Sequence, residues 1–403
     1  MSDSARNTNL TACGLERNPT SSTFSATCAD TDSARVLIST LDKQPIWKVS
    51  VSDTSKPPFE LGVLADPTSC HEPIDISNVD SDSAITYLKG MLRIRRAEQK
   101  LAATREAGLI GGPVHLGAGQ EAVAVGVAAS LRKSDRVFGA HRSHSHVISM
   151  GGSLHGLFAE ALGKDTGLSK GMGGSMHLWD QPNGFYGSVP IVAGTVPLAV
   201  GAGLAASMQG TGDIAVSYLG DGAVEEGIVH ESLNLASVLK VPVVFVVENN
   251  LFASHMHIEL RQSSDATSRF AIANGMPYAL VDGNDVVAVA AAAEELIGRA
   301  RRGEGPGFLE AVTYRWYGHV DWREDIDVGV HRSDKDLTNW RARCPIARLE
   351  ASLQTREEWS TAQLSDFEGE LADEVEDAWE LAMADPYPEP AALLDRVYSG
   401  EAR

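Results

Sequence analysis

The chain has 403 residues, of which 43% are hydrophobic, enough to bury a large core and too many for a disordered protein. Its 34 lysines and arginines are outnumbered by 54 aspartates and glutamates, which gives a formal net charge of -20 at pH 7. This acidity excludes a protein that binds nucleic acid through a broad basic surface, so any anionic ligand must be held by local groups.

The first 80 residues predict a polar extension that is partly disordered or loosely packed. They contain serine, threonine and proline clusters and little periodicity, which allows at most a short strand or two. Three arginines among the serines and threonines of residues 1–40 resemble an organelle transit peptide, but four acidic residues in the same stretch argue against one. A flexible tail is therefore the expectation.

Residues 81–403 predict an α/β domain followed by a helical C-terminal region. From Ile85 onward, apolar residues recur at helical spacing. Between about 110 and 320, glycine-rich turns separate Ala/Val-rich helices from β-branched runs at 214–219, 241–247 and 308–313. Such alternation indicates a mostly parallel sheet with helices on both faces. A last helix over 365–384 should end where Asp385-Pro386 prevents its continuation.

The segment 214–252 predicts one βαβ unit. In chain order it comprises a strand at 214–219, the turn Gly220-Asp221-Gly222, a helix over 223–240, a strand at 241–247 and then Glu248-Asn249-Asn250. Because such crossovers join parallel strands, Asp221 and Asn250 should lie at the same carboxyl edge of the sheet, where doubly wound folds bind ligands.

These residue types favour a magnesium site. The carboxylate of Asp221, the amide of Asn250 and a nearby backbone carbonyl, taken as that of Phe252, are three hard oxygen ligands that suit Mg²⁺ better than zinc or copper. The glycines beside Asp221 allow close approach of a ligand, and the N-terminus of the following helix would favour an anion. The pattern therefore predicts a diphosphate bridged through Mg²⁺.

The turn Gly220-Asp221-Gly222 followed by Asn249-Asn250 resembles the thiamine diphosphate motif. The stretch GDGAVEEGIVHESLNLASVLKVPVVFVVENNLFA is similar to the α subunits of the decarboxylating component of 2-oxo acid dehydrogenases, including the pyruvate, branched-chain and acetoin types. Further motifs follow the family's order: His115-Leu116 with Gly119-Gln120-Glu121-Ala122, Gly171 to His177, Ile191-Val192 with Val196-Pro197-Leu198, Tyr314-Arg315 with Gly318-His319, and ADEVEDAWELAMADPYPEP. The resemblance spans about residues 84–399.

The resemblance implies a thiamine-diphosphate-binding fold, the cofactors thiamine diphosphate and Mg²⁺, and a set of site residues. Implied metal ligands are Asp221, Asn250 and the carbonyl of Phe252. Implied catalytic residues are His319, His144 and Arg142. Implied cofactor-binding residues are His141, Arg142, His177, Pro190, Val192, Gly220, Asp221, Gly222, Ala223, Asn250 and His319, with Ile191 beside the aminopyrimidine ring.

The resemblance also implies partners. In the family, a glutamate that acts on the aminopyrimidine comes from a separate β subunit, and no residue here matches it. We therefore expect the chain to be inactive alone and to assemble with β subunits, two of each chain. It would decarboxylate or cleave a small 2-oxo acid or an acetoin-like substrate and pass the acyl unit to a lipoyl-bearing acyltransferase.

Two other interpretations stay open at this point. One is a thiamine-diphosphate-dependent carboligase or transketolase-like subunit with another acceptor. The other is a non-catalytic scaffold, against which the intact Asp221, Asn250, Arg142 and His319 argue.

Four positions depart from the family's pattern. Glu225 stands where an asparagine is usual, Pro190 replaces a glycine, and His141 replaces a tyrosine. Val320 replaces the serine that a regulatory kinase modifies in mitochondrial members, which excludes phosphorylation at that position. The first three put the substrate or acceptor in doubt, since they lie near the diphosphate and the mouth of the site.

Other sites are disfavoured by local pattern. Residues 201–206 imitate a dinucleotide fingerprint, but they lead into a strand instead of following one, which indicates a close-packed helix. His141, His144 and His146 could form a zinc cluster, but no cysteine or further acid stands at ligand spacing. The scattered cysteines, Cys13, Cys28, Cys70 and Cys344, form no disulfide framework, and no apolar run reaches the roughly 18 residues of a membrane span, so we expect a cytoplasmic protein without a membrane partner.

Overall fold

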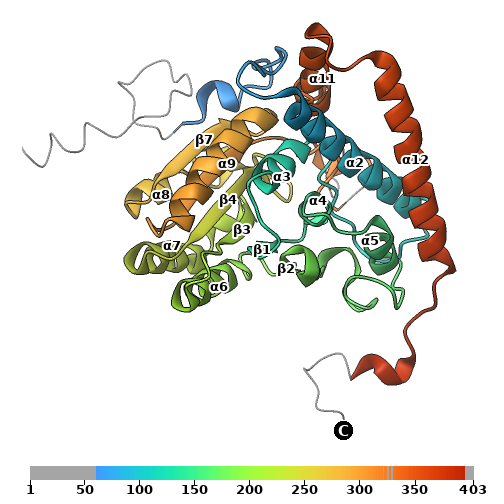
Figure 1. Ribbon diagram of the computed structural model, residues 1–403, viewed down its shortest axis with the longest axis horizontal. Helices are drawn as coiled ribbons and strands as arrows, with labels where there is room; N and C mark the ends of the chain where they lie inside the picture. Colours follow the sequence, from blue (N-terminus) through green and yellow to red (C-terminus); the bar gives the residue numbers. More distant parts are fainter. Residues whose placement is uncertain (1–59, 321, 325, 328–329, 395–403) are drawn as a thin grey trace, which may run out of the picture. The chain divides into compact units, whose positions relative to one another are not determined.

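A six-stranded parallel sheet lies at the centre of the computed structural model, which describes residues 60–320, 322–324, 326–327 and 330–394 (Figure 1). The strand order is β2-β1-β3-β4-β8-β7, and every neighbouring pair is parallel. The strands are β1 Arg136–Gly139, β2 Phe185–Ser188, β3 Ala215–Gly220, β4 Val243–Asn249, β7 Tyr278–Asp282 and β8 Gly307–Val312. The parallel α/β architecture predicted from the sequence is confirmed.

Both faces of the sheet are buried, and successive side chains of each strand alternate between the two faces. Val244 and Val246 of β4 pack into one core, while Val243, Phe245 and Val247 pack into a second core on the opposite face. Because successive side chains of a strand point to opposite faces, a strand covered on both sides must be apolar throughout. This is why the runs near 214, 241 and 308 show no polar alternation.

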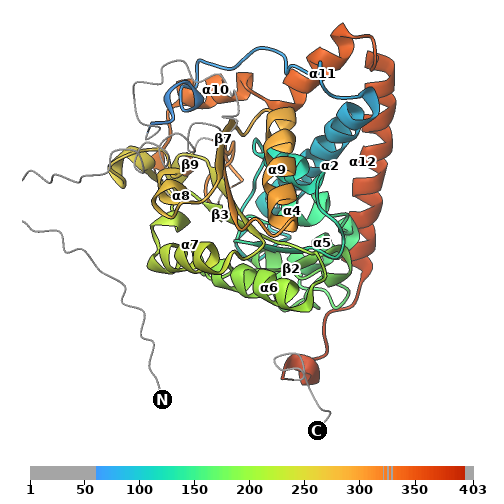
Figure 2. The same ribbon diagram turned by 60° about the vertical axis from the view of Figure 1, so that its left-hand side comes forward.

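Helices cover each face of the sheet. The first core is covered by α2 Ser81–Glu106, α3 Glu121–Ala128, α4 His144–Ser149, α5 Leu154–Ala161, α9 Val286–Arg301, α11 Pro345–Thr355 and α12 Thr361–Ala384. The second core is covered by α6 Val196–Gln209, α7 Gly227–Leu239 and α8 Arg269–Ala273. Figure 2 shows α6 and α7 side by side, with α12 running along α2 at the far edge.

Short elements complete the described fold. A third, smaller core contains Trp340 of α10 Asp334–Ala342 together with Val312 and Tyr314 at the end of β8. Two antiparallel pairs are β5 Phe252–Ala253 with β6 Met256–His257, and β9 Ile326–Asp327 with β10 Val330–His331. The 3-10 turns are η1 Gly62–Leu64, η2 Gly174–Met176, η3 Gln181–Asn183, η4 Ala223–Glu225, η5 Ile258–Leu260 and η6 Pro390–Leu393.

Residues 60–80, assigned to the extension from the sequence, pack against the α/β core. Leu61, Ile74 and Ile76 are buried, and the backbone N–H of Leu61 donates to Asp265 Oδ1 at 3.0 Å. The predictions for residues 1–59 lie outside the described residues.

The predicted helix over 223–240 is wrong at its start. Ala223–Glu225 form the 3-10 turn η4, Glu226 is extended with φ -72° and ψ 134°, and the α-helix begins only at Gly227. The backbone groups beside Gly222 therefore belong to a tight turn, and the N-terminus of α7 does not follow directly from β3. Residues 201–206, in contrast, lie within α6, as predicted.

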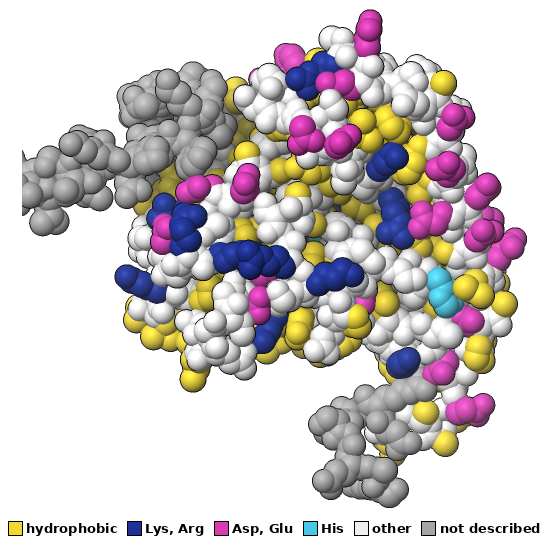
Figure 3. All heavy atoms as spheres, viewed as in Figure 1, with side chains coloured by type: hydrophobic (Ala, Val, Ile, Leu, Met, Phe, Trp, Pro, Cys, Tyr) yellow, Lys and Arg dark blue, Asp and Glu magenta, His cyan; other side chains and the backbone are white. Residues whose placement is uncertain are grey.

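The outer surface of α12 is acidic. Its buried stripe consists of Leu371, Val375, Trp379 and Ala382, and the exposed positions between them include Asp373, Glu374, Glu376, Asp377 and Glu380. Acidic side chains accordingly line the right-hand edge of the molecule in Figure 3. None of the helices that the structure describes combines the length and apolarity needed to cross a membrane.

Candidate functional site

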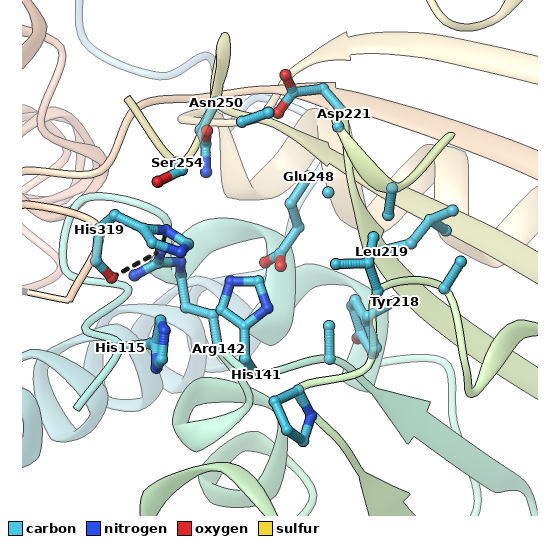
Figure 4. Close-up of a pocket in the computed structure, with 18 of the residues that line it drawn as sticks. His115, His141, Arg142, Tyr218, Leu219, Asp221, Glu248, Asn250, Ser254 and His319 are labelled. Atoms are coloured by element: carbon cyan, nitrogen blue, oxygen red, sulfur yellow. Dashed lines mark hydrogen bonds between the residues drawn. The ribbon is translucent and has the colours of Figure 1, made fainter. Parts of the chain in front are cut away.

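A cavity of about 380 Å³ opens at the carboxyl edge of the sheet, beside the ends of β1, β3 and β4 (Figure 4). Eleven of the residues singled out from the sequence line it: His141, Arg142, Pro190, Val192, Gly220, Asp221, Gly222, Ala223, Asn250, Phe252 and His319. They come from segments as distant as β1 and the chain after β8, so the fold brings together what the sequence keeps apart.

Asp221 and Asn250 face the cavity from neighbouring strands. The two strands pair in parallel, with Gly220 opposite Glu248, so the two residues follow at the same edge. Asp221 is 1% exposed, and burial raises the pKa of its carboxyl group while the nearby Arg261 guanidinium opposes that rise. Its Oδ2 accepts a hydrogen bond from Arg261, whereas its buried Oδ1 has no hydrogen-bond partner among the described residues.

An orphaned buried carboxylate oxygen is costly unless a donor or a cation satisfies it. Asn250 and Phe252 line the same cavity, and the carboxylate of Asp221, the side-chain amide of Asn250 and the backbone carbonyl of Phe252 each carry an oxygen that can ligate a metal ion. The donor set therefore fits a hard divalent cation such as Mg²⁺.

The amide of Asn250 is oriented by two contacts. Its Nδ2 donates to Gln120 Oε1 at 3.1 Å, and its Oδ1 accepts from the backbone N–H of Phe252 at 3.2 Å. Leu251 and Ser254 adopt positive φ angles of 69° and 55°, and this backbone brings Phe252 into the two-residue strand β5. The neighbouring Asn249 points elsewhere, where its Nδ2 donates to Glu310 Oε1 at 2.8 Å.

Glycine is required at position 222 by a close approach of two segments. A Cβ at this position would lie 2.5 Å from the Cβ of Ala253, which is well inside van der Waals contact. The turn after β3 therefore packs directly on β5, and this contact holds the segments of Asp221 and Phe252 together.

Three histidines form a cluster in the cavity wall. The ring centroids of His115, His141 and His319 lie 4.6 to 5.2 Å apart, and one ring nitrogen of each lies within 4.8 Å of the others. Burial, reinforced by the Arg142 guanidinium, lowers the pKa of all three, that of His141 to about 3. The cluster therefore presents neutral imidazoles at pH 7, with Arg142 as the adjacent cation.

Several lining residues were not singled out as site residues from the sequence. Gln120 was quoted only as part of a motif, although it orients Asn250. Glu248 faces the cavity and lies 3.3 Å from His146 Nε2, and the ring of His146 stacks on Tyr218 with centroids 3.7 Å apart. The signal for Glu248 was present, since it lies two residues before Asn250 at the end of a strand whose edge was already predicted to bind a ligand.

Three residues predicted at the site lie outside the lining of this cavity. His144 is fully buried, with Nδ1 3.3 Å from Glu98 Oε1 and Nε2 2.7 Å from Ser175 Oγ. His177 is exposed, and its carbonyl accepts a hydrogen bond from Ser169 Oγ. Ile191, expected beside the aminopyrimidine, is 71% exposed.

The zinc cluster considered for His141, His144 and His146 does not form. His141 contacts the rings of His115 and His319, His144 bonds to Ser175, and His146 bonds to Glu248. His144 and His146 lie two positions apart on α4, which directs them to different sides of the helix.

Comparison with known proteins gives one family. The family model described as "Dehydrogenase E1 component" matches residues 89–391. The α subunit of acetoin:2,6-dichlorophenolindophenol oxidoreductase from Bacillus subtilis is 39% identical over 326 residues, covering 80% of this chain and 95% of the relative. The α subunit of the pyruvate dehydrogenase E1 component from Rhizobium meliloti is 37% identical over 328 residues, covering 80% of this chain and 92% of the relative. A chloroplastic pyruvate dehydrogenase E1 α subunit from Oryza sativa is 36% identical over 334 residues, covering 80% of this chain and 77% of the relative.

Proposed function

The chain belongs to the dehydrogenase E1 component family, and from this premise we propose that it is the α subunit of a thiamine-diphosphate-dependent 2-oxo acid or acetoin dehydrogenase. The observation that carries the proposal is the placement of Asp221 and Asn250 at adjoining strand ends beside a cavity, with one buried carboxylate oxygen that has no hydrogen-bond partner in the described part of the chain. That arrangement is what a diphosphate held through a divalent cation requires.

Mg²⁺ would be held by the side chains of Asp221 and Asn250 and by the carbonyl of Phe252. The fit rests on the orphaned Oδ1 of Asp221 and on an all-oxygen donor set. When bound, thiamine diphosphate supplies the electron sink that allows a bond next to a keto carbon to break. The residues of this chain would bind and orient the cofactor.

The diphosphate would lie between the turn after β3 and the cluster around Arg142. Gly222 and Ala223 offer backbone groups there, and Gly220 gives access from the strand end. Arg142 and His319 supply donors from the opposite wall, where His141 adds a third polar group. A local cation is needed because the net charge of -20 disfavours an anion at long range.

Pro190 and Val192, which line the cavity, would contact the aminopyrimidine side of the cofactor. Catalytic roles for His319, His144 and Arg142 remain predictions, as does a cofactor contact from His177. His319 and Arg142 are favoured among them because both reach the cavity.

A β subunit is the expected partner, since relatives carry the name of an α subunit and no residue here matches the glutamate that acts on the aminopyrimidine. We further propose two chains of each kind, a lipoyl-bearing acyltransferase as acceptor and a cytoplasmic location. Both pyruvate and acetoin enzymes are among the relatives, so both compounds are candidate substrates.

The test begins with calorimetric titration of thiamine diphosphate plus Mg²⁺ into the chain assembled with its β subunit. Assays of pyruvate, branched 2-oxo acids and acetoin with an artificial electron acceptor then identify the substrate. We expect binding only with Mg²⁺ present and turnover only when both subunits are present. Robust turnover by the purified chain alone would contradict the assigned division of labour.

Changing the acceptor in the assay distinguishes the second candidate function, a carboligase, from a dehydrogenase component. If the enzyme is a carboligase, turnover with an aldehyde acceptor should exceed turnover with a lipoyl domain. If it is a dehydrogenase component, the order is reversed.

A further inference from the structure

We call the proposed metal site formed by Asp221, Asn250 and Phe252 the metal corner. Arg261 lies next to this corner, although the sequence analysis did not single it out. Its Nη2 donates to Asp221 Oδ2, its Nη1 to Glu225 Oε1, and its Nε to the carbonyl of Met256 at 3.1 Å. The side chain is 6% exposed. All three nitrogens of the guanidinium are thus used, by two residues of the connection after β3 and by one residue of β6.

Gln262, the residue after Arg261, bonds to the same two residues, Asp221 and Glu225. Gln262 Nε2 donates to the backbone carbonyl of Asp221 at 3.2 Å and to Glu225 Oε1 at 2.8 Å, and Gln262 Oε1 accepts from Arg269. Asp221 is therefore held at its side chain by Arg261 and at its backbone by Gln262. Both residues directly follow η5, the short 3-10 turn that comes after the β5–β6 hairpin carrying Phe252.

The two oxygens of Asp221 have different surroundings, and this difference indicates the role of Arg261. Arg261 bonds to Oδ2, and the buried Oδ1 has no hydrogen-bond partner within the ranges that the structure describes. Were Arg261 only a substitute for a missing cation, a planar guanidinium facing a carboxylate would be expected to bond both oxygens, as a bidentate pair does. Here its second arm reaches Glu225 instead, so one oxygen of Asp221 stays available.

Glu225 also changes the charge of the corner. Arg261 alone would repel a divalent cation a few ångströms away, but the carboxylate of Glu225 neutralises it. With Asp221 included, the formal charges of the three side chains sum to -1. An attractive field for a cation is thereby kept although an arginine is adjacent.

We propose that Arg261, backed by Glu225, is a positioning residue that fixes the carboxylate of Asp221 so that Oδ1 points at the metal. The inference rests on the proposed function, since it assumes a divalent cation at Asp221 and Asn250. It goes further by assigning the orientation of the ligand to a pair of residues outside the ligand set. Glu225, which departs from the family's usual asparagine, acquires a role as the support of Arg261.

The test measures metal binding separately from turnover. The full chain is assembled with its β subunit and titrated with Mn²⁺ at saturating thiamine diphosphate, with free Mn²⁺ followed by electron paramagnetic resonance. Arg261→Gln should raise the Kd for Mn²⁺ by about tenfold, because a charge-assisted hydrogen bond that orients the ligand is lost. Arg261→Lys, which keeps the charge but not the fork, should give a smaller increase.

A matched control is an arginine–aspartate pair at the amino ends of the strands, away from the cavity. Arg301 makes a partly buried ion pair with Asp135 just before β1, through Nη1 and Nη2 at 3.0 and 2.8 Å. Arg301→Gln should lower the melting temperature but leave the Kd for Mn²⁺ within twofold of the wild type. In Arg261→Gln, kcat at saturating metal should stay within a few fold of the wild-type value, which a general loss of structure would not allow.

The outcomes distinguish an error in the proposed metal site from an error in the role of Arg261. If the wild-type complex binds no Mn²⁺, the proposed metal site is wrong and the role of Arg261 falls with it. If the wild type binds Mn²⁺ but Arg261→Gln binds it equally well or more tightly, the metal site stands and the positioning role is refuted, because a mere competitor would release its ligand when removed. Should Arg261→Gln fail to fold, Arg261→Lys decides by the same criterion.

Discussion

Nη2 of Arg142 lies 3.3 Å from Nδ1 of His319, and this contact joins two walls of the cavity that are 177 residues apart in the chain (Figure 4). Nη1 of the same guanidinium donates to the carbonyl of Leu116. Arg142 therefore ties the segment before α3, the start of α4 and the chain after β8 to one another. It is also the cation beside three neutral histidines.

Removing this cation should weaken binding of the cofactor's diphosphate. Arg142→Gln is expected to raise the Kd for thiamine diphosphate by tenfold or more, because a charge-assisted hydrogen bond to an anion contributes about 1.5–3 kcal/mol. Isothermal titration of the assembled complex at saturating Mg²⁺ measures the change. The control is Arg93→Gln, which removes a partly exposed ion pair with Glu374 on the outer side of α2 and should leave the Kd unaltered. An equal Kd in Arg142→Gln would show that the diphosphate lies elsewhere.

The adjacent asparagines 249 and 250 provide a built-in comparison of structure and function. Asn250 lines the cavity, whereas Asn249 donates to Glu310 Oε1 and to the carbonyl of Asp265 inside the fold. Asn250→Ala should abolish Mg²⁺-dependent binding of thiamine diphosphate, because it removes a metal ligand, and should shift the melting temperature little.

Asn249→Ala should lower the stability of the fold and leave the binding of thiamine diphosphate largely unchanged. It leaves the buried carboxylate of Glu310 with one donor fewer, a loss of about 1–3 kcal/mol in the free energy of unfolding. Thermal unfolding and cofactor titration of both variants measure the contrast. The interpretation fails if the two variants exchange effects, or if both lose binding and stability alike.

The histidine cluster should make the fold less stable in acid. His115, His141 and His319 have pKa values below the ordinary value of 6.5, so the unfolded chain takes up protons that the folded chain does not as the pH falls below 6.5. For His141 this difference persists down to about pH 3, and each histidine costs up to about 1.4 kcal/mol per pH unit. Above about pH 7.5 all three are largely neutral in both states and contribute little pH dependence.

Replacing one member of the cluster tests this dependence. His141→Gln should reduce the slope of unfolding free energy against pH between 6.5 and 4.5, measured by urea unfolding. Comparison at pH 7.5 isolates the effect of packing, since the proton difference vanishes there. Parallel curves for the wild type and the variant would refute the assignment.

The parts of the fold set by local pattern were predictable from the sequence. The β-branched run 241–247 and the residues Glu248-Asn249-Asn250 after it gave both a buried strand and the edge at which its polar residues lie, because strand ends and crossovers obey rules that need only neighbours in the chain. The same holds for α9 and α12, whose apolar stripes repeat at helical spacing.

What the sequence could not give is contact between distant segments. Arg261 meets Asp221 only because the β5–β6 hairpin folds back over the turn after β3, and Gln120 meets Asn250 from a segment 130 residues away. His144 and His177 were transferred from motif positions, and their side chains are aimed by helix phase and loop geometry that motif spacing does not contain. The break at Glu226 was missed because the glycine beside it, Gly227, is only a weak signal against a helix when it stands alone.

Glu160 organises the glycine-rich segment between α5 and β2 from within the core. Its Oε2 accepts hydrogen bonds from the backbone N–H groups of Ser169 and Gly171, and its Oε1 accepts from those of Gly173 and Gly174. The carboxylate is fully buried, so four peptide groups depend on one side chain. Gly171 also has a positive φ of 74°, and a Cβ there would lie 2.7 Å from the carbonyl oxygen of Gly163.

Glu160→Gln should therefore loosen this segment selectively. The new amide group faces two N–H groups that need an acceptor, which should cost about 3 kcal/mol in unfolding free energy and raise hydrogen exchange across residues 169–174. Glu231→Gln, on the exposed face of α7, is the control and should alter neither quantity. Because Ser175 in this segment bonds to His144 and not to the metal corner, the Kd for Mn²⁺ should stay near the wild-type value. Unchanged exchange in 169–174 would mean that the segment is held by its glycine conformations and not by the carboxylate.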